Sequence, residues 1–415
     1  EVRGAELQQG RPTKHPTPIV TPEGVRGQWR GSELRPLGAP RVWRDRGRLL
    51  MELGPRGPMG NGLTGRLESD DGLAWHWCPP HEQGLAIDGE QDDGGECKVT
   101  WFLDEAESDE GRRYKGALVR GVWTKDPRRW LVTSPDGVRW RVEAEMEGMH
   151  HLAESGGPSF RDPRTGDYVA VGRTSASGHR ALGMLRSEDL IHWRGGAPLR
   201  DVDEPEGAPP ILRRGHPVAP AIIDPAGEPQ HEQIYWGTVW PQDSSYLCLY
   251  GRYHWDARYE ACLALSQDGQ VFQRPFGSEP FLPTGAPGEW DSGIVFMDYG
   301  VTRPVPFPER GSVRLYYAGS TWRHGADPYR APAAVGVAEL RADGWAYLQP
   351  ASEAALPATV LTVPIQPAGR TRVRIGAEGP VTCETVDAQE DGTHRLRFTL
   401  HSHHSKLYSF RWEAA

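Results

Sequence analysis

The stretch SDDGLAW, residues 69–75, recurs along the chain with a common pattern: Asp, usually followed by Gly, and then an aromatic residue three positions after the Gly. The other copies are SPDGVRW (134–140), SEDLIHW (187–193), SQDGQVF (266–272) and a degenerate RADGWAY (341–347). The Asp caps a turn, Gly supplies a positive φ, and the aromatic residue begins the next strand, so each copy predicts a hairpin. One copy would indicate only a common turn. Five copies, each closing a strand-rich block, predict five propeller blades.

The composition indicates a mostly β chain. Its 415 residues include 50 Gly, 37 Pro and 16 Trp, which suit many tight turns between short strands with aromatic side chains. Length alone would favour two or three domains unless the chain has a repeat architecture. We therefore predict an all-β fold: a five-bladed β-propeller with a small C-terminal β-sandwich-like appendage.

The positions of the repeat divide the chain into three segments. Residues 1–37, Pro-rich around KHPTPIVTPEG (14–24), are expected to run over the surface. The propeller is expected over 38–349, and alternating segments such as HRLRFTLHS (394–402) predict a stabilising β-unit over 350–415. The predicted blades are 38–78, 95–143, 154–196, 214–275 and 290–349.

Charge and cysteine usage exclude several classes of partner. The net charge is −9 and the basic residues are spread along the chain, whereas nucleic-acid binding needs a clustered basic face. No apolar run is long enough to cross a bilayer, and EVRGAELQQG (1–10) lacks signal-peptide character. We expect a secreted or periplasmic protein if a signal peptide has been removed, and a cytoplasmic one otherwise. The five Cys residues show no zinc spacing and are expected to be buried thiols.

Three segments align as innermost strands, the strands that line the centre of a propeller. They are ECKVTWFLD (96–104), ESGGPSFRD (154–162) and HPVAPAIID (216–224), and in each an ionisable residue is followed eight positions later by Asp. The second acids, Asp104, Asp162 and Asp224, precede a new strand and are expected in hairpins. A strand of six or seven residues spans about 20 Å, so its two ends cannot share a site.

The first residues of these strands are therefore the expected site. Glu154 and Glu96 are the candidate pair for acid and base or nucleophile in glycoside hydrolysis, since mutual repulsion raises one pKa and leaves the other group ionised. Asp291, in GEWDSG, is expected to stabilise positive charge or orient the sugar, and His216 to bind a hydroxyl. Further substrate-binding candidates are Arg120, Arg173, Arg323 and His324 at the ends of second strands, and Trp290 beside Asp291.

Each of these residues also has a structural interpretation. Carboxylates at strand starts can simply accept backbone hydrogen bonds, although three at equivalent positions favour catalysis. The arginines suit a sugar that carries carboxylate or sulfate, but salt bridges to the catalytic acids are an equal alternative. Trp290 can stack on a sugar or pack between blades.

The sequence resembles the five-bladed propeller glycoside hydrolases, which include families 32, 43, 62, 68, 117 and 130. The resemblance rests on GMLRSEDLIHW (183–193), on SFRDPRTGDYVAVG (159–172) and on the trailing β-region. It is most similar to uncharacterised family 32-like bacterial propeller proteins that share GEWDSG and a terminal LYSF. The Asn-Asp-Pro nucleophile motif of the fructan enzymes is missing, which argues against fructofuranosidase activity. Their Arg-Asp-Pro motif implies that Asp162 stabilises the transition state, whereas the blade alignment places Asp162 in a hairpin. We follow the alignment.

The resemblance and the aligned acids together predict an exo-acting glycoside hydrolase for a furanoside or an acidic or sulfated plant or algal glycan. A non-catalytic carbohydrate-binding propeller is the first alternative, with a sugar or a Ca²⁺ ion held in the central channel. A polysaccharide lyase that uses His216 as base beside Arg173 is the second. We assign no metal-binding residue and expect no required cofactor, no nucleic acid and no membrane partner.

Overall fold

The computed structural model describes most of the chain, in two compact units. The larger unit comprises Lys14–Val305 and Leu315–Ala338, and the smaller comprises Glu1–Thr13, Pro306–Arg314 and Glu339–Ala415. The described residues are 1–21, 39–53, 65–78, 86–88, 97–120, 128–149, 152, 156–176, 179–195, 221–223, 233–254, 256–297, 302–323, 333–365, 371–386 and 393–414.

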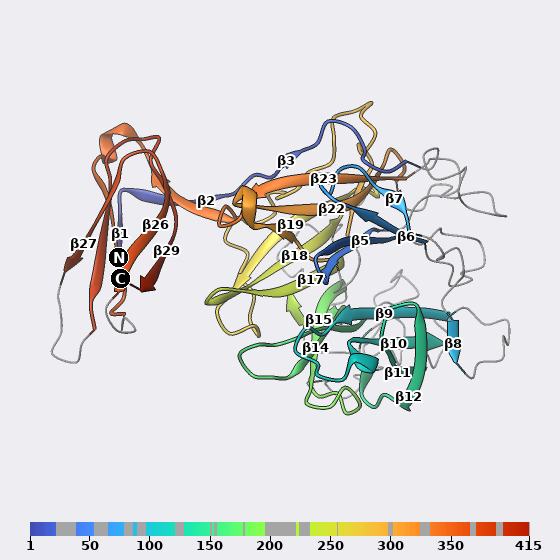
Figure 1. Cartoon of the computed structure of the whole chain (residues 1–415). Helices are drawn as coiled ribbons and strands as arrows, with labels where there is room; N and C mark the ends of the chain where they lie inside the picture. The colour runs from blue at the N-terminus through green and yellow to red at the C-terminus, as the bar shows by residue number, and fades with distance from the viewer. Residues whose placement is uncertain are drawn as a thin grey trace. The chain divides into compact units, whose positions relative to one another are not determined.

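The larger unit is built from mostly antiparallel sheets of consecutive strands (Figure 1). The first sheet is β4 (Arg41–Asp45), β5 (Arg48–Leu53), β6 (Gly65–Ser69) and β7 (His76–Trp77). The second is β9 (Cys97–Leu103), β10 (Tyr114–Arg120), β11 (Arg128–Ser134) and β12 (Arg139–Glu145), with β8 (Ala86–Asp88) parallel to β12. The third is β13 (Gly157–Arg161), β14 (Tyr168–Ala176), β15 (His179–Ser187) and β16 (Ala221–Ile223).

The fourth sheet has eight strands and contains two groups. One group is β17 (Gln233–Gln242), β18 (Ser245–Tyr253) and β19 (Tyr259–Ser266), and the other is β20 (Ile294–Phe296), β21 (Val305–Phe307), β22 (Ser312–Ser320), β23 (Ala334–Arg341) and β3 (Thr13–Lys14). A single parallel pair, Tyr259 with Ile294, joins the groups. The fold is all-β and propeller-like, as expected. Five blades stay a prediction, in which these two groups are the fourth and fifth.

The predicted hairpin chemistry is present in four copies of the repeat. In SPDGVRW, Ser134 Oγ donates to Asp136 Oδ1 at 3.0 Å and accepts the Gly137 N–H at 2.8 Å. Asp136 Oδ1 accepts the next two backbone N–H groups, and Gly137 has a φ of 72°. The same bonds form in the copies that begin at 69, 187 and 266. The turn therefore follows from the local sequence.

The fifth copy folds differently, because Arg341 replaces the Ser. The turn is closed by a backbone bond from the Gly344 N–H to the Arg341 carbonyl, at 2.8 Å. Its acid, Asp343, accepts hydrogen bonds from Ser409 Oγ at 2.6 Å and from Arg341 Nε at 2.5 Å.

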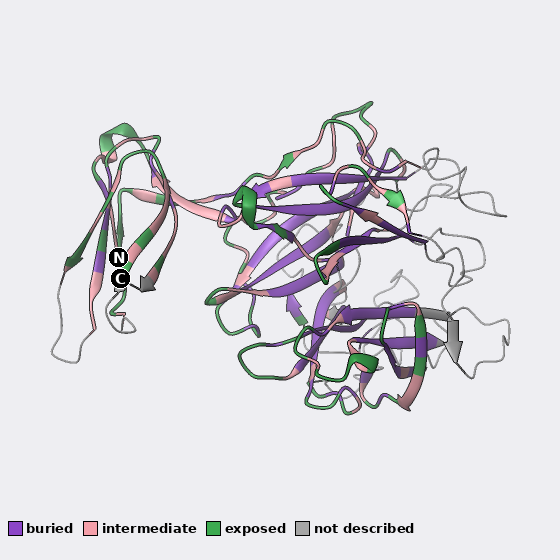
Figure 2. Ribbon diagram, viewed as in Figure 1, coloured by how far each residue is buried: buried purple, intermediate pink, exposed green. Residues whose placement is uncertain are grey.

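Neighbouring sheets of the larger unit pack through apolar strand faces, which Figure 2 shows as buried. A core of fifteen described residues joins the third sheet to β17–β19 and includes Phe160, Leu182, Val239 and Tyr246. Polar contacts between the Asp that ends an innermost strand and the Tyr that begins the second strand of the next sheet reinforce this packing. The pairs are Asp45 with Tyr114 (2.7 Å), Asp104 with Tyr168 (3.5 Å) and Asp162 with Tyr246 (2.7 Å).

The smaller unit contains two four-stranded sheets, which matches the expected sandwich-like appendage. One is β1 (Val2–Arg3), β25 (Ala358–Leu361), β28 (Arg395–Leu400) and β27 (Val381–Val386), and the other is β2 (Ala5–Gln9), β24 (Ala346–Pro350), β29 (Lys406–Ala414) and β26 (Thr371–Glu378). The alternating RLRFTL of β28 buries Leu396, Phe398 and Leu400.

The N-terminal residues, which were expected to run over the surface, form paired strands whose side chains are mostly exposed or half-buried. Residues 2–9 form β1 and β2, which pair with β25 and β24 of the smaller unit, and β3 pairs in the sheet of β23. The Pro-rich composition around residue 14 suggested a loop, but strand pairing with distant segments overrides local preference. The smaller unit also begins at Glu339, ahead of the boundary at 350 that the repeat indicated.

Candidate functional site

The fourth group of strands begins later than the aligned segment 216–224. Only 221–223 of that segment are described, and they form β16, which pairs with β15 at the edge of the third sheet. The first strand of the group is β17, and its hairpin to β18 contains Asp243. The segments 216–224 and 235–243 both end in Asp, so the sequence alignment could not distinguish them. The strand pairing shows that the second segment belongs to the first strand of the group. His216 itself lies outside the described residues.

Tyr235 occupies the position eight residues before Asp243, at the entrance of the innermost strand β17. It is the extra residue of a β-bulge, because Ile234 pairs with Arg252 and Trp236 with Gly251. Bulges re-aim side chains and are frequent beside active sites. Tyr235 was not among the predicted site residues, although the eight-residue spacing to Asp243 marks it in the sequence.

The ring of Tyr235 lies between aromatic and cationic groups. Its centroid is 4.9 Å from that of Tyr259 and 5.7 Å from that of Tyr253, both in stacked orientation. The guanidinium carbons of Arg173 and Arg180 lie 5.2 Å and 5.6 Å from the same centroid. Two strands of the third sheet therefore bring positive charge to the entrance of β17.

Arg173 was expected at this end of the propeller, whereas Arg180 was not. Arg173 is 3 % exposed, and Arg180 donates to Gln233 Oε1 at 2.5 Å. A planar guanidinium binds carboxylate or sulfate through paired donors, so this cluster, which we call the Tyr235 cluster (Tyr235, Tyr253, Tyr259, Arg173 and Arg180), suits an anionic ligand.

A buried acid, Glu260, lies on β19 next to Tyr259. Its Oε2 is 2.8 Å from His254 Nε2 and 3.5 Å from Arg252 Nη2, and its Oε1 is 3.4 Å from both the backbone N and Oγ1 of Thr284. Burial raises the pKa of Glu260. The hydrogen bond and charge of His254, the backbone hydrogen bond of Thr284 and the charge of Arg252 outweigh burial and lower the pKa to about 2. Glu260 is therefore an ionised anchor rather than a proton donor.

Asp291, which was expected to face the propeller axis, is 2 % exposed and is held by two side chains of its own sheet. Its Oδ2 accepts from Lys14 Nζ at 2.6 Å and from Tyr317 Oη at 3.0 Å. Lys14 belongs to β3 at the edge of the sheet, and Tyr317 to β22, the strand that pairs with β20. The sequence pattern did not indicate these partners, and the catalytic role of Asp291 stays a prediction.

Trp290 packs against the same strands. Its ring is stacked on Tyr317 with centroids 5.8 Å apart, and a Cβ at Gly319 or Gly336 would come within 2.4 Å and 2.7 Å of it. The absence of a side chain at these two glycines leaves room for the indole ring. The ring face of Trp290 that lies against Tyr317 therefore packs within the protein and does not stack on a sugar.

The other predicted residues are only partly described. Arg323 is exposed and pairs with Asp256 at 3.5 Å. Arg120 ends β10, but its side chain lies outside the described part of the structure, as do the residues Glu96, Glu154, His216 and His324. Their assignment stays a prediction.

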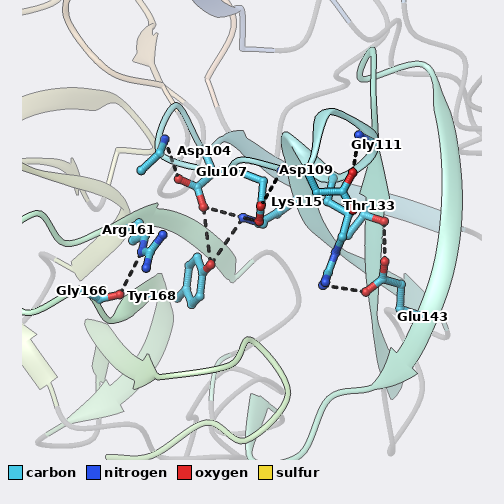
Figure 3. Close-up of polar contacts among 12 residues, drawn as sticks. Asp104, Glu107, Asp109, Gly111, Lys115, Thr133, Glu143, Arg161, Gly166 and Tyr168 are labelled. Atoms are coloured by element: carbon cyan, nitrogen blue, oxygen red, sulfur yellow. Dashed lines mark hydrogen bonds and ion pairs between the residues drawn. The ribbon is translucent and has the colours of Figure 1, made fainter.

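Asp104 and Asp162 lie in hairpins, as the alignment predicted, whereas Asp224 lies outside the described residues. Asp162 is 0 % exposed and accepts hydrogen bonds from Tyr246 Oη and, at 3.0 Å, from Arg186 Nη1. These two bonds hold the pKa of its carboxyl below the ordinary value although burial raises it. Figure 3 shows the equivalent network around Asp104, whose Oδ2 is 2.5 Å from the buried Lys115 Nζ. These acids are structural parts of the hairpin end.

Among the described residues, no group of three or more His, Cys, Asp or Glu side chains could hold a metal ion. No helix in the described part of the chain is long and apolar enough to span a membrane.

Comparison with known proteins gives a likeness of fold alone. No protein-family profile and no curated protein matches the sequence. A solved glycosyl hydrolase from Bacteroides ovatus is similar at 16% identity and a TM-score of 0.50, over 80% of this chain and 94% of that one. A mannoside phosphorylase-family hydrolase targeting β-1,2 mannosidic linkages in Candida mannan (17%, 0.49, 80% and 94%) and a thermostable family-43 glycoside hydrolase (13%, 0.47, 73% and 89%) also match.

Proposed function

We propose that the protein is a glycoside hydrolase whose substrate is a furanoside or an acidic or sulfated glycan. The observation that carries this proposal is the Tyr235 cluster, where an aromatic ring and two guanidinium groups meet at the entrance of an innermost strand. Guanidinium groups bind the carboxylate or sulfate that acidic sugars carry, and the Tyr235 ring, which both arginines contact, holds them side by side. The fold is also that of the solved glycosyl hydrolase described above.

Glu154 and Glu96 are the proposed catalytic pair. In the sequence, Glu96 directly precedes β9 and Glu154 precedes β13 by three residues. We therefore expect both carboxylates at the strand end that holds Tyr235. One protonates the leaving oxygen, and the other activates water or attacks the anomeric carbon. Their carboxyl separation decides the outcome, with about 5 Å giving retention and roughly 6.5–9.5 Å giving inversion.

The test is a panel of aryl glycosides and natural glycans with the full chain, its Glu154→Gln variant and a control, Glu188→Gln. Glu188 is exposed and pairs only with the exposed Arg194 among the described residues. We expect Glu154→Gln to lose hydrolysis while keeping its fold and glycan binding, and Glu188→Gln to keep both. Full activity of Glu154→Gln on a substrate that the parent cleaves would refute the assignment.

A non-catalytic carbohydrate-binding protein is the second candidate, favoured by the ion pair that Asp291 forms with Lys14 and the hydrogen bond that it accepts from Tyr317. Glycan binding by the parent without any cleavage product would support it. An unsaturated uronate product, detected by its ultraviolet absorbance and lost in His216→Ala, would instead indicate a lyase.

A further inference from the structure

An arginine of the fifth group of strands reaches the innermost strand of the third sheet. Arg303 lies in the segment between β20 and β21, and its Nη2 donates to the carbonyl oxygen of Ser159 in β13. Its guanidinium carbon lies 4.9 Å from the ring centroid of Phe160. The third and fifth groups are not neighbours in a five-bladed ring, so Arg303 lies near the propeller axis.

Two anchors fix the position of Arg303. Thr302, 0 % exposed, donates from Oγ1 to the carbonyl oxygen of Pro40 at the start of β4, at 3.1 Å. On the other side, Ser159 is the extra residue of a β-bulge between Pro158 and Phe160. Its Oγ bonds within the third sheet to the Gly157 carbonyl, while its own carbonyl oxygen accepts from Arg303.

The charge of Arg303 has no carboxylate partner within ion-pair distance among the described residues. The residue as a whole is half-buried. Protein groups nevertheless surround it closely enough that desolvation lowers the pKa of Arg303 to about 10, with Glu105 acting only as a more distant charge. Arg303 stays cationic at neutral pH.

We propose that Arg303 is an anion-binding residue at the propeller axis, which binds the carboxylate or sulfate of the carbohydrate. The inference rests on the proposed function, because it takes the anion to be part of a glycan. It narrows the substrate class to acidic sugars and adds a residue that the sequence pattern did not reveal. The Tyr235 cluster supplies positive charge at the strand entrances, and Arg303 supplies it between the innermost strands.

The test measures binding by the full chain with calorimetry, without any need for turnover. The probes are glucuronate, glucose and inorganic sulfate, and the variants are Arg303→Gln, Arg303→Lys and the control Arg139→Gln. Arg139 is exposed and makes no ion pair in the described part of the chain. We expect the parent to prefer glucuronate to glucose, Arg303→Gln to lose about tenfold or more in glucuronate affinity, Arg303→Lys to lose less, and the control to be unchanged.

Three results would overturn the proposal. The first is equal glucuronate affinity in Arg303→Gln and the parent, and the second is no preference of the parent for glucuronate over glucose. The third is binding that depends on Arg303 for inorganic sulfate but not for glucuronate, because the anion would then not be part of a sugar. If Arg303→Gln does not fold, Arg303→Lys and the probe preference of the parent decide the question. The hydrolase assignment is tested by the activity of Glu154→Gln, and the anion site is tested by binding to the Arg303 variants. Failure of the first therefore does not affect the interpretation of the second.

Discussion

The hydroxyl of Tyr246 donates to the carboxylate of Asp162 at 2.7 Å, from the sheet that follows Asp162 in the chain. Arg164, two residues on, lies over the Tyr246 ring with its guanidinium carbon 4.2 Å from the centroid. Asp162 and Arg164, within the stretch RDPR of residues 161–164, therefore fasten the third sheet to the β17–β19 group.

Removal of this contact should lower stability rather than chemistry. We expect Tyr246→Phe to lower the free energy of unfolding by about 1 kcal/mol and Asp162→Asn by about 2–3 kcal/mol, because Asp162 is buried and also accepts from Arg186. Urea unfolding measures both values. Normal stability of Asp162→Asn together with lost hydrolysis would instead support the transition-state role implied by the fructan enzymes.

Glu260 should make stability depend on pH in the acid range. Its pKa is about 2 in the folded protein against an ordinary value of 4.5, so its contribution is complete above pH 4.5 and is lost as pH falls toward 2. The contribution is on the order of 3 kcal/mol. Unfolding measured against pH for the parent and Glu260→Gln should show a stability difference that shrinks over this window. A difference independent of pH would mean that Glu260 is not ionised by its partners.

Gly137 and Gly166 form a matched pair for testing the repeat turn. Both have left-handed backbones, with φ of 72° and 83°, but a Cβ at Gly137 would lie 3.0 Å from the Tyr114 ring, whereas nothing lies within 4 Å at Gly166. We expect Gly166→Ala to cost about 1–2 kcal/mol from backbone strain. Gly137→Ala should cost more, because crowding adds about 1–3 kcal/mol. Equal losses in thermal or urea unfolding would show that the ring moves aside freely.

Lys14 and Asp291 should be coupled. Lys14→Met leaves the 2 % exposed Asp291 with Tyr317 as its one side-chain hydrogen-bond partner among the described residues, and should cost about 3 kcal/mol or more. Asp291→Asn added to Lys14→Met should restore part of that loss. A double-mutant cycle by chemical denaturation measures the coupling, and additive effects would contradict an ion pair in solution.

The local sequence was sufficient for the turns. Ser134, Asp136 and Gly137 satisfy one another within four residues, so their pattern predicts the hairpin and, repeated, the propeller-like fold. Asp162 was placed in its hairpin for the same reason, because turn chemistry depends on adjacent residues.

Contacts between distant segments decided the rest. Strand pairing made β17 rather than 216–224 the first strand of its group, and so placed Tyr235 at the entrance. Lys14 pairs with Asp291 across 277 residues, and Arg303 meets Ser159 across 144 residues. Such contacts form only when the sheets assemble, since no periodicity or motif records which distant side chains will meet. The sequence alone therefore determined the repeated turn, and the tertiary structure decided which residues that turn brings together.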